Sequence, residues 1–77
     1  MDSSHLVMGV KQTLRALHAG KALRVILAQD AARHVVEPVD DLARRQAVPV
    51  QWVPTMRELG QAGGLQVGCA CAAQLEK

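Results

Sequence analysis

A lysine, an amide and an arginine lie close together near the start of the chain. Lys11, Gln12 and Arg15 all lie off the stripe of Leu14 and Leu17, which share one face of a helix and can anchor it to a core. Side-chain donors near a helix start, together with its free backbone N–H groups, form a natural site for phosphate groups and base edges. The alternative is an ordinary polar first turn that contacts only water.

Two cysteines near the end of the chain are the next candidates. In a strand, Cys69 and Cys71 would place their sulfur atoms on one face. Two thiolates could bind a soft metal ion, but two ligands do not complete a zinc site, and no Cys or His follows at a familiar spacing. The alternative is a pair of small buried side chains in a tightly packed strand. We therefore expect no metal and no cofactor.

No arrangement in the sequence is typical of an active site. His5, His18 and His34 are scattered without a helical or strand period, and no Ser or Cys lies in a nucleophile-like context. The glycine-containing segment 60–68 lacks the Lys and Ser/Thr of a phosphate-binding loop. It also follows a helix, whereas a dinucleotide-binding fingerprint follows a strand. We expect a binding protein and not an enzyme.

Length and composition indicate one globular domain over residues 1–77. Hydrophobic residues make up 49% of the chain and charged residues 21%, which argues against disorder. One Trp, no Phe and no Tyr leave no set of aromatic platforms for stacking single-stranded bases. No apolar run is long enough to span a membrane, and the N-terminus does not read as a signal peptide. Two cysteines cannot form a disulfide framework, so we expect a cytoplasmic protein.

Hydrophobic periodicity and turn residues predict alternating helices and strands. Residues 1–5 are expected to form a frayed N-terminal segment, and residues 6–10 fit either a helical turn or a short strand. The predicted helices cover residues 11–19, 37–46 and 56–62, and the predicted strands cover residues 23–28, 48–53 and 67–73. This alternation indicates a layered α/β domain with a mainly parallel or mixed sheet.

Local signals set several boundaries in this prediction. Gly20 and the pair Gly63-Gly64 follow helices as stops. Thr55 with Glu58 three residues later forms a capping box at the start of the third helix.

The second helix carries a charge pattern that complements its dipole. Pro38 fits a first helical turn, with Asp40 and Asp41 in that turn and the pair Arg44-Arg45 in the last. Trp52 reads most simply as a core residue with its indole N–H at an edge.

Three sequence stretches, MGVKQTLRAL, VILAQDA and MRELGQAGGLQVGCACA, resemble the ribosomal L-seven-Ae/L-thirty-e family. The most specific parts are the GVKQ run with its following arginine and the LGQAGGLQVG run, and the resemblance covers about residues 6–73 in the right order. It is closest to the small bacterial members that bind kink-turn RNA. The resemblance implies an α/β fold that is a three-layer α/β/α sandwich with a small mixed sheet.

The resemblance also assigns roles to the start of the first helix. In the family, a Gly-Thr-Asn-Glu run opens a helix that enters the major groove at the kink, where Asn and Glu read tandem G·A pairs and a following Lys supports them at the backbone. Gly9 matches the glycine, Val10 stands where Thr is common, Lys11 matches the Asn, Gln12 the Glu and Arg15 the Lys. The Lys-Gln pair keeps donors for guanine acceptors but lacks the carboxylate that accepts from guanine N–H groups.

A second RNA-binding segment is implied near the end of the chain. Leu65, Gln66 and Val67 match the family's apolar loop, which covers a flipped-out nucleotide in the bulge. Several archaeal and eukaryotic relatives have an acidic residue near the position of Ala32, and this chain lacks it.

Three functions are therefore compatible with the sequence. The leading hypothesis is an RNA-binding protein that recognises and stabilises kink-turns in ribosomal RNA or in a structured regulatory RNA, with the ribosome as one setting. The second is a protein-protein interaction module on the same fold, and the third is a small thiol or metal protein that uses Cys69 and Cys71. We expect a monomer with RNA as its partner and no membrane contact.

Overall fold

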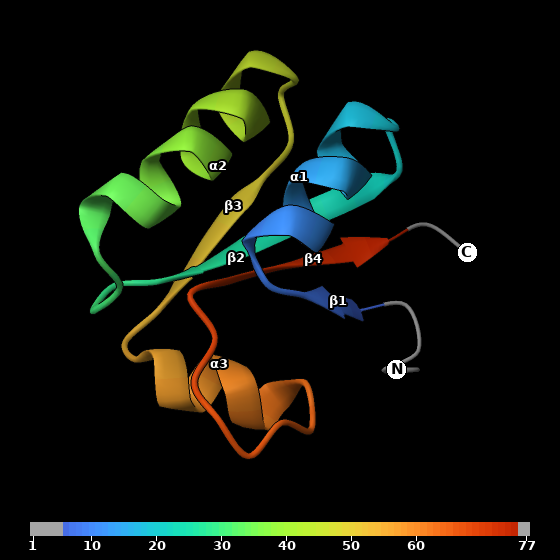
Figure 1. Ribbon diagram of the computed structural model, residues 1–77. Helices are drawn as coiled ribbons and strands as arrows, with labels where there is room; N and C mark the ends of the chain where they lie inside the picture. The colour runs from blue at the N-terminus through green and yellow to red at the C-terminus, as the bar shows by residue number, and fades with distance from the viewer. Residues whose placement is uncertain (1–5, 76–77) are drawn as a thin grey trace.

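Four strands and three helices alternate in the computed structural model, which describes residues 6–75. In chain order they are β1 (Leu6–Met8), α1 (Val10–His18), β2 (Ala22–Ala28), α2 (Arg33–Arg45), β3 (Val50–Val53), α3 (Met56–Ala62) and β4 (Cys71–Leu75) (Figure 1). The sequence allowed either a helical turn or a short strand at the start of the described residues, and the structure has the strand β1 there. The predicted N-terminal segment over residues 1–5 lies outside the described residues. Between residues 6 and 75, no helix combines the length and apolar character needed to cross a membrane.

The strands form one mixed sheet in the order β1-β4-β2-β3. β2 and β3 are parallel and are connected through α2, whereas β4 pairs antiparallel with both β1 and β2. β1 and β3 are consequently the two edge strands. The mixed sheet predicted from the sequence is confirmed.

Side chains of β2 alternate between two cores because successive residues of a strand point to opposite faces. Val25 and Leu27 join the buried side chains of α1 and α2, whereas Ile26 and Ala28 join those of α3. All four are at most 7% exposed, so this strand is buried on both faces as its sequence predicted. Figure 1 shows the resulting layers, with α1 and α2 on one side of the sheet and α3 on the other. The fold is the predicted three-layer sandwich.

The first helix spans Val10–His18, so it begins and ends one residue earlier than the predicted 11–19. Gly20 follows it with φ 68°, a conformation that glycine adopts without a steric cost. The N–H groups of Gly20 and Lys21 donate to the carbonyls of Leu17 and Ala16, at 3.1 and 3.0 Å, which satisfies the last turn.

The second helix begins at Arg33, four residues before the predicted start at residue 37. Ala32 is its N-cap residue and has no side chain that could signal a helix start. Pro38 consequently lies in the second turn and not in the first, so the role assigned to it was wrong. It removes the helical donor to the carbonyl of His34, and both residues are exposed, where water can serve as the donor.

Because α2 begins earlier than predicted, its acidic residues do not lie in the first turn. Asp40 and Asp41 lie in the middle of the helix, where they do not complement its N-terminus. Asp40 instead accepts a 2.9 Å hydrogen bond from Arg44 one turn later. Arg44 and Arg45 do lie in the last turn, as predicted. Ala47 then ends the helix with φ 57°, a conformation that costs energy for a residue with a Cβ atom.

Trp52 is not the core residue that the sequence predicted, because its side chain is 40% exposed. It lies on β3, which spans Val50–Val53 rather than the predicted 48–53 and forms an edge of the sheet. A side chain on an edge strand has a neighbouring strand on one side only, so it is covered less than a side chain in the middle of the sheet.

The last strand begins four residues later than predicted and separates the two cysteines. Cys69 precedes β4 and packs on the α3 face, whereas Cys71 packs on the face of α1 and α2. The prediction of a shared face was wrong because the strand alternation does not extend back to Cys69, whose N–H donates to the carbonyl of Met56 at 2.9 Å. Both thiols are buried and free, as the packing alternative expected. Across residues 6–75, no group of three or more His, Cys, Asp or Glu is arranged to hold a metal ion.

Candidate nucleic-acid interface

Gly9 turns the chain from β1 into α1. Its φ of 97° and ψ of 161° fall in a region that is accessible almost only to glycine. Its N–H donates to the carbonyl of Cys71 at 2.8 Å, and its own carbonyl accepts from the backbone N–H of Thr13 at 3.0 Å. The glycine that the resemblance placed at the start of the RNA-binding helix is thus required by the backbone.

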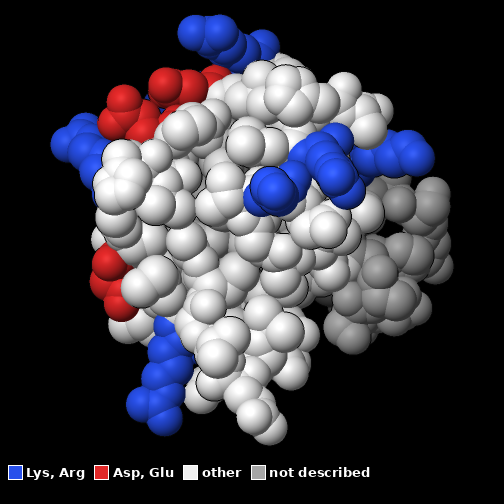
Figure 2. Space-filling model, in the orientation of Figure 1, with Lys and Arg blue, Asp and Glu red and all other residues white. Residues whose placement is uncertain are grey.

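Lys11, Gln12 and Arg15 are all exposed on α1, as predicted. The opposite side of the helix is buried, so these three side chains point away from the core. Figure 2 shows Lys and Arg atoms gathered over this helix and Asp and Glu atoms over α2. The first turn of α1 contains no acidic residue, and no side chain caps it among the described residues. Its N–H groups and the positive end of the helix dipole are therefore free to attract an anion.

The loop after α3 begins with a sharply defined helix end. Thr55 caps the start of α3 by accepting from the N–H of Glu58 at 3.1 Å, which confirms the threonine half of the predicted capping box. The Glu58 carboxylate accepts from the Thr55 hydroxyl at 3.4 Å. At the other end, Gly64 has φ 79°, and the N–H of Leu65 donates to the carbonyl of Gly60 at 2.8 Å. This pattern satisfies the last carbonyls of the helix and sets the direction in which the chain leaves it.

The same loop folds back against α3. A Cβ atom on Gly60 would lie 2.1 Å from the carbonyl oxygen of Val67, so only a glycine allows this approach. Because the loop backbone faces the helix, the side chains of Leu65 and Val67 remain 38% and 70% exposed, and Gln66 is exposed as well. Both apolar side chains are thus accessible in the free protein, which a loop that covers a nucleotide requires.

The two candidate segments meet where β1 passes α3. A Cβ atom on Gly63 would lie 2.5 Å from the thioether of Met8, which shows that Met8 packs directly on the end of α3. Met8 immediately precedes Gly9, and Gly63 lies two residues before Leu65. The start of α1 and the root of the apolar loop are therefore neighbours, although 54 residues separate Gly9 from Gly63 along the chain.

Thr13 is a contributor that the sequence analysis missed. It is fully buried, and its hydroxyl donates to the carbonyl of Gly9 at 2.7 Å. Burial raises the pKa of the neighbouring Cys71 thiol to about 11, an effect that a hydrogen bond with Thr13 partly offsets. Thr13 thereby closes the first turn of α1 onto Gly9, whose own N–H is bonded to the carbonyl of Cys71 in β4. A threonine four residues after a helix-opening glycine was the available signal, since its hydroxyl can bond back to that carbonyl.

The chain belongs to the Ribosomal protein L7Ae/L30e/S12e/Gadd45 family, whose pattern it matches over residues 1–77. The resemblance read from the sequence is confirmed. An "RNA-binding protein YbxF" of Geobacillus stearothermophilus is 43% identical over 75 residues, which are 97% of this chain and 92% of the relative. An RNA-binding protein of Geobacillus sp. (strain WCH70) is 44% identical over 73 residues, 95% of this chain and 89% of the relative. Neither name describes an enzyme, which agrees with the expectation from the sequence.

Solved structures confirm the fold independently. The "Giardia lamblia 15.5kD RNA binding protein" superposes with a TM-score of 0.89 at 24% identity, over 96% of this chain and 62% of that one. A protein of unknown function from Bacillus halodurans superposes with a TM-score of 0.86 at 26% identity, over 96% of this chain and 74% of that one. The three-layer arrangement is thus shared at low sequence identity.

Proposed function

We propose that this chain binds RNA and recognises kink-turns, in which tandem G·A pairs adjoin a bulge, in ribosomal RNA or in a structured regulatory RNA. The observation that carries the proposal is the contact between Met8 and Gly63, because it makes the cationic start of α1 a neighbour of an exposed apolar loop. An RNA bulge offers base edges and an unstacked base at one place, and it therefore suits a surface that is polar on one side and apolar on the other. Relatives that are named RNA-binding proteins over nearly the whole chain support the coarser part of the proposal.

The start of α1 is the part that reads the base pairs in this proposal. An A-form duplex has a deep and narrow major groove, so a helix reaches base edges only where a kink opens the groove. Gln12 carries both a donor and an acceptor and can bond two positions of a base edge. Lys11 supplies only donors, which suit the acceptor atoms of guanine, and Arg15 lies one turn further on, where a phosphate group is its natural partner.

The loop of Leu65, Gln66 and Val67 covers the unpaired nucleotide in this proposal. Leu65 and Val67 offer apolar surface that is already exposed in the free protein. A base that leaves the stack in the bulge can bury this surface, and burial of apolar area favours binding. The loop is held to α3 by its backbone, so little ordering is needed when RNA binds.

A titration with two RNAs tests the proposal. One RNA contains a kink-turn, and the control replaces the tandem G·A pairs by Watson–Crick pairs and is otherwise identical. We expect the kink-turn RNA to bind about tenfold more tightly or better, since a bidentate base contact is worth about 1–3 kcal/mol by analogy with DNA. Equal affinity for the two RNAs at several salt concentrations would leave only nonspecific attraction to phosphate groups and would refute the proposal.

A further inference from the structure

A groove lies between α2 and the edge strand β3. It encloses about 550 Å³. Arg33, Glu37, Asp40 and Asp41 line it from α2 together with Val36, and Trp52 lines it from β3. β3 is the edge of the sheet opposite β1, which leads into α1. The Trp52 wall of the groove and β1 therefore belong to opposite edges of the sheet. Gln29 and Ala31, in the loop between β2 and α2, complete the lining.

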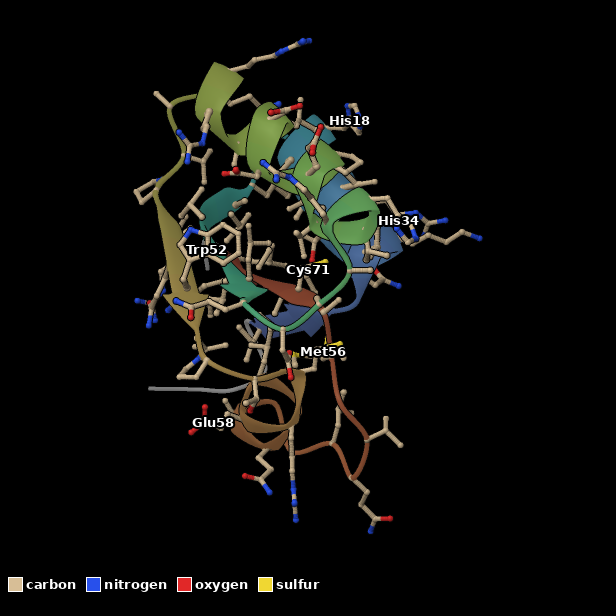
Figure 3. All side chains as sticks on the ribbon, turned by 90° about the vertical axis from the view of Figure 1, so that its left-hand side faces the viewer. His18, His34, Trp52, Met56, Glu58 and Cys71 are labelled. Atoms are coloured by element: carbon tan, nitrogen blue, oxygen red, sulfur yellow. The ribbon has the colours of Figure 1, made fainter. Side chains whose placement is uncertain are left out.

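Trp52 gives this groove an aromatic wall. Trp52 pairs in register with Leu27, whose side chain packs toward α1 and α2, so both side chains lie on that face of the sheet. Figure 3 shows the indole on the side of β3 that faces α2. It is the only aromatic residue of the chain, and 40% of it remains exposed. The face of an exposed indole attracts a cation such as a guanidinium or ammonium group.

The backbone of β3 adds hydrogen-bonding capacity beside the indole. The N–H groups of Val25 and Gln29 donate to the carbonyls of Pro49 and Val53, which fixes the residues of β3 that face β2. Because the two sides of a strand alternate, the N–H and C=O of Trp52 point to the outer edge, where residues 6–75 provide no further strand. An extended segment of another chain can pair there.

Charge selects the kind of partner. The groove lining contains three carboxylates and one guanidinium, in a chain whose formal net charge is +2. Glu37 already pairs with Arg33 at 3.4 Å and Asp40 with Arg44 at 2.9 Å, so Asp41 is the carboxylate of the lining that has no ion pair among residues 6–75. Carboxylates repel phosphate groups, so the lining disfavours RNA and favours a cationic peptide.

We propose that this groove binds an extended segment of a partner protein that carries arginine or lysine. The segment adds to the free edge of β3, and alternate side chains point toward α2. A cationic side chain then lies against the indole of Trp52 and near the carboxylates of Glu37 and Asp41. Pro49 and Pro54 flank β3, so pairing is limited to about the four residues Val50–Val53.

Tryptophan fluorescence tests this proposal selectively, because Trp52 is the only Trp and the chain contains no Tyr. The probe is a synthetic eight-residue peptide of alternating arginine and threonine. We expect a saturable change in the Trp52 emission as the peptide is added. A peptide with glutamate in place of arginine should cause no change, and a peptide N-methylated at alternate residues should lose binding because it cannot pair with a strand edge.

Two exposed carboxylates provide the matched protein variant. Because both side chains are exposed, Glu37→Gln with Asp41→Asn should leave the fold intact. It should weaken binding of the arginine peptide about threefold to tenfold. The substitutions Arg57→Gln and Glu58→Gln on α3 lie outside the groove and should leave peptide affinity unchanged. Unchanged affinity in the Glu37/Asp41 variant, or equal affinity for the N-methylated peptide, would overturn the proposal. So would a saturable Trp52 response to an oligouridine that matched the response to the arginine peptide, since it would assign the groove to RNA.

Discussion

Gly60→Ala tests how the position of the apolar loop affects RNA binding, because it moves the loop without changing the side chains of the loop. The new Cβ atom would lie 2.1 Å from the carbonyl oxygen of Val67 and 3.1 Å from the carbonyl carbon of the same residue. Both are backbone atoms, so no side-chain rotation relieves the overlap. The loop has to move away from α3 by about 1 Å to restore ordinary contact. The substitution therefore displaces Leu65 and Val67 without altering either side chain.

Two opposing effects set the expected stability. An alanine in a helix is normally about 1 kcal/mol more favourable than a glycine, whereas overpacking costs about 1–3 kcal/mol. We expect Gly60→Ala to lower the free energy of unfolding by up to about 2 kcal/mol. A domain of this length is stable by about 4–12 kcal/mol, so the variant should remain folded. Displacement of Leu65 should also remove about 1–2 kcal/mol of apolar burial on RNA, which weakens binding about fivefold to thirtyfold.

Urea unfolding and RNA titration measure the two effects. Gly63→Ala is a comparison variant, because the three atoms nearest its Cβ atom belong to the flexible Met8 side chain and not to backbone. It should perturb stability and binding less than Gly60→Ala does. The binding loss of Gly60→Ala should disappear on an RNA that lacks the unpaired nucleotide. If Gly60→Ala is as stable as the wild type and binds both RNAs as tightly, the loop is not held by its close approach to α3, and this reasoning fails.

Three further predictions concern separate parts of the molecule. Arg15→Ala should weaken RNA binding broadly and reduce the slope of log affinity against log salt concentration by about one unit. Gln12→Ala should cost about 1–3 kcal/mol of binding free energy, mainly on RNA with G·A pairs. Parallel losses on RNAs with and without G·A pairs would contradict the base-reading role of Gln12. Ala47→Gly should raise the free energy of unfolding by about 0.5–1 kcal/mol in urea titrations, because the residue has φ 57°, and a loss of stability would exclude strain there. Burial raises the pKa of Cys71 to about 11, so the folded state holds a proton that the unfolded state releases near pH 9. The free energy of unfolding should therefore fall as the pH rises from 9 to 11, and it should fall less steeply in Cys71→Ala.

The elements that the sequence predicted well carry their signals locally. α3 begins and ends at the predicted residues because Thr55 caps its first turn and the Gly63-Gly64 pair ends it. β2 was recognisable because it is central in the sheet and apolar on both faces. The exposure of Lys11, Gln12 and Arg15 followed from the helical spacing of their apolar neighbours.

The elements that were predicted poorly depend on contacts between distant segments. The start of β4 was misplaced because residues just before it bond to α3, as the Cys69 N–H does to the Met56 carbonyl. The start of α2 has no capping side chain, so Pro38 gave the stronger but misleading signal. Trp52 was assigned to the core because the sequence does not indicate which strand lies at the edge. The contact of Met8 with Gly63 likewise depends on the fold and could not be predicted from spacing.

The most direct test of the central claim measures whether the protein bends its RNA. A donor and an acceptor fluorophore are placed on the two helical ends of a kink-turn RNA in a buffer without Mg²⁺, and energy transfer is followed as protein is added. We predict that energy transfer rises to saturation at one protein per RNA. It should not rise with the RNA whose G·A pairs are replaced, or with a Lys11→Ala, Gln12→Ala variant. An equal rise for both RNAs, or binding of the kink-turn RNA without any rise, would contradict this prediction.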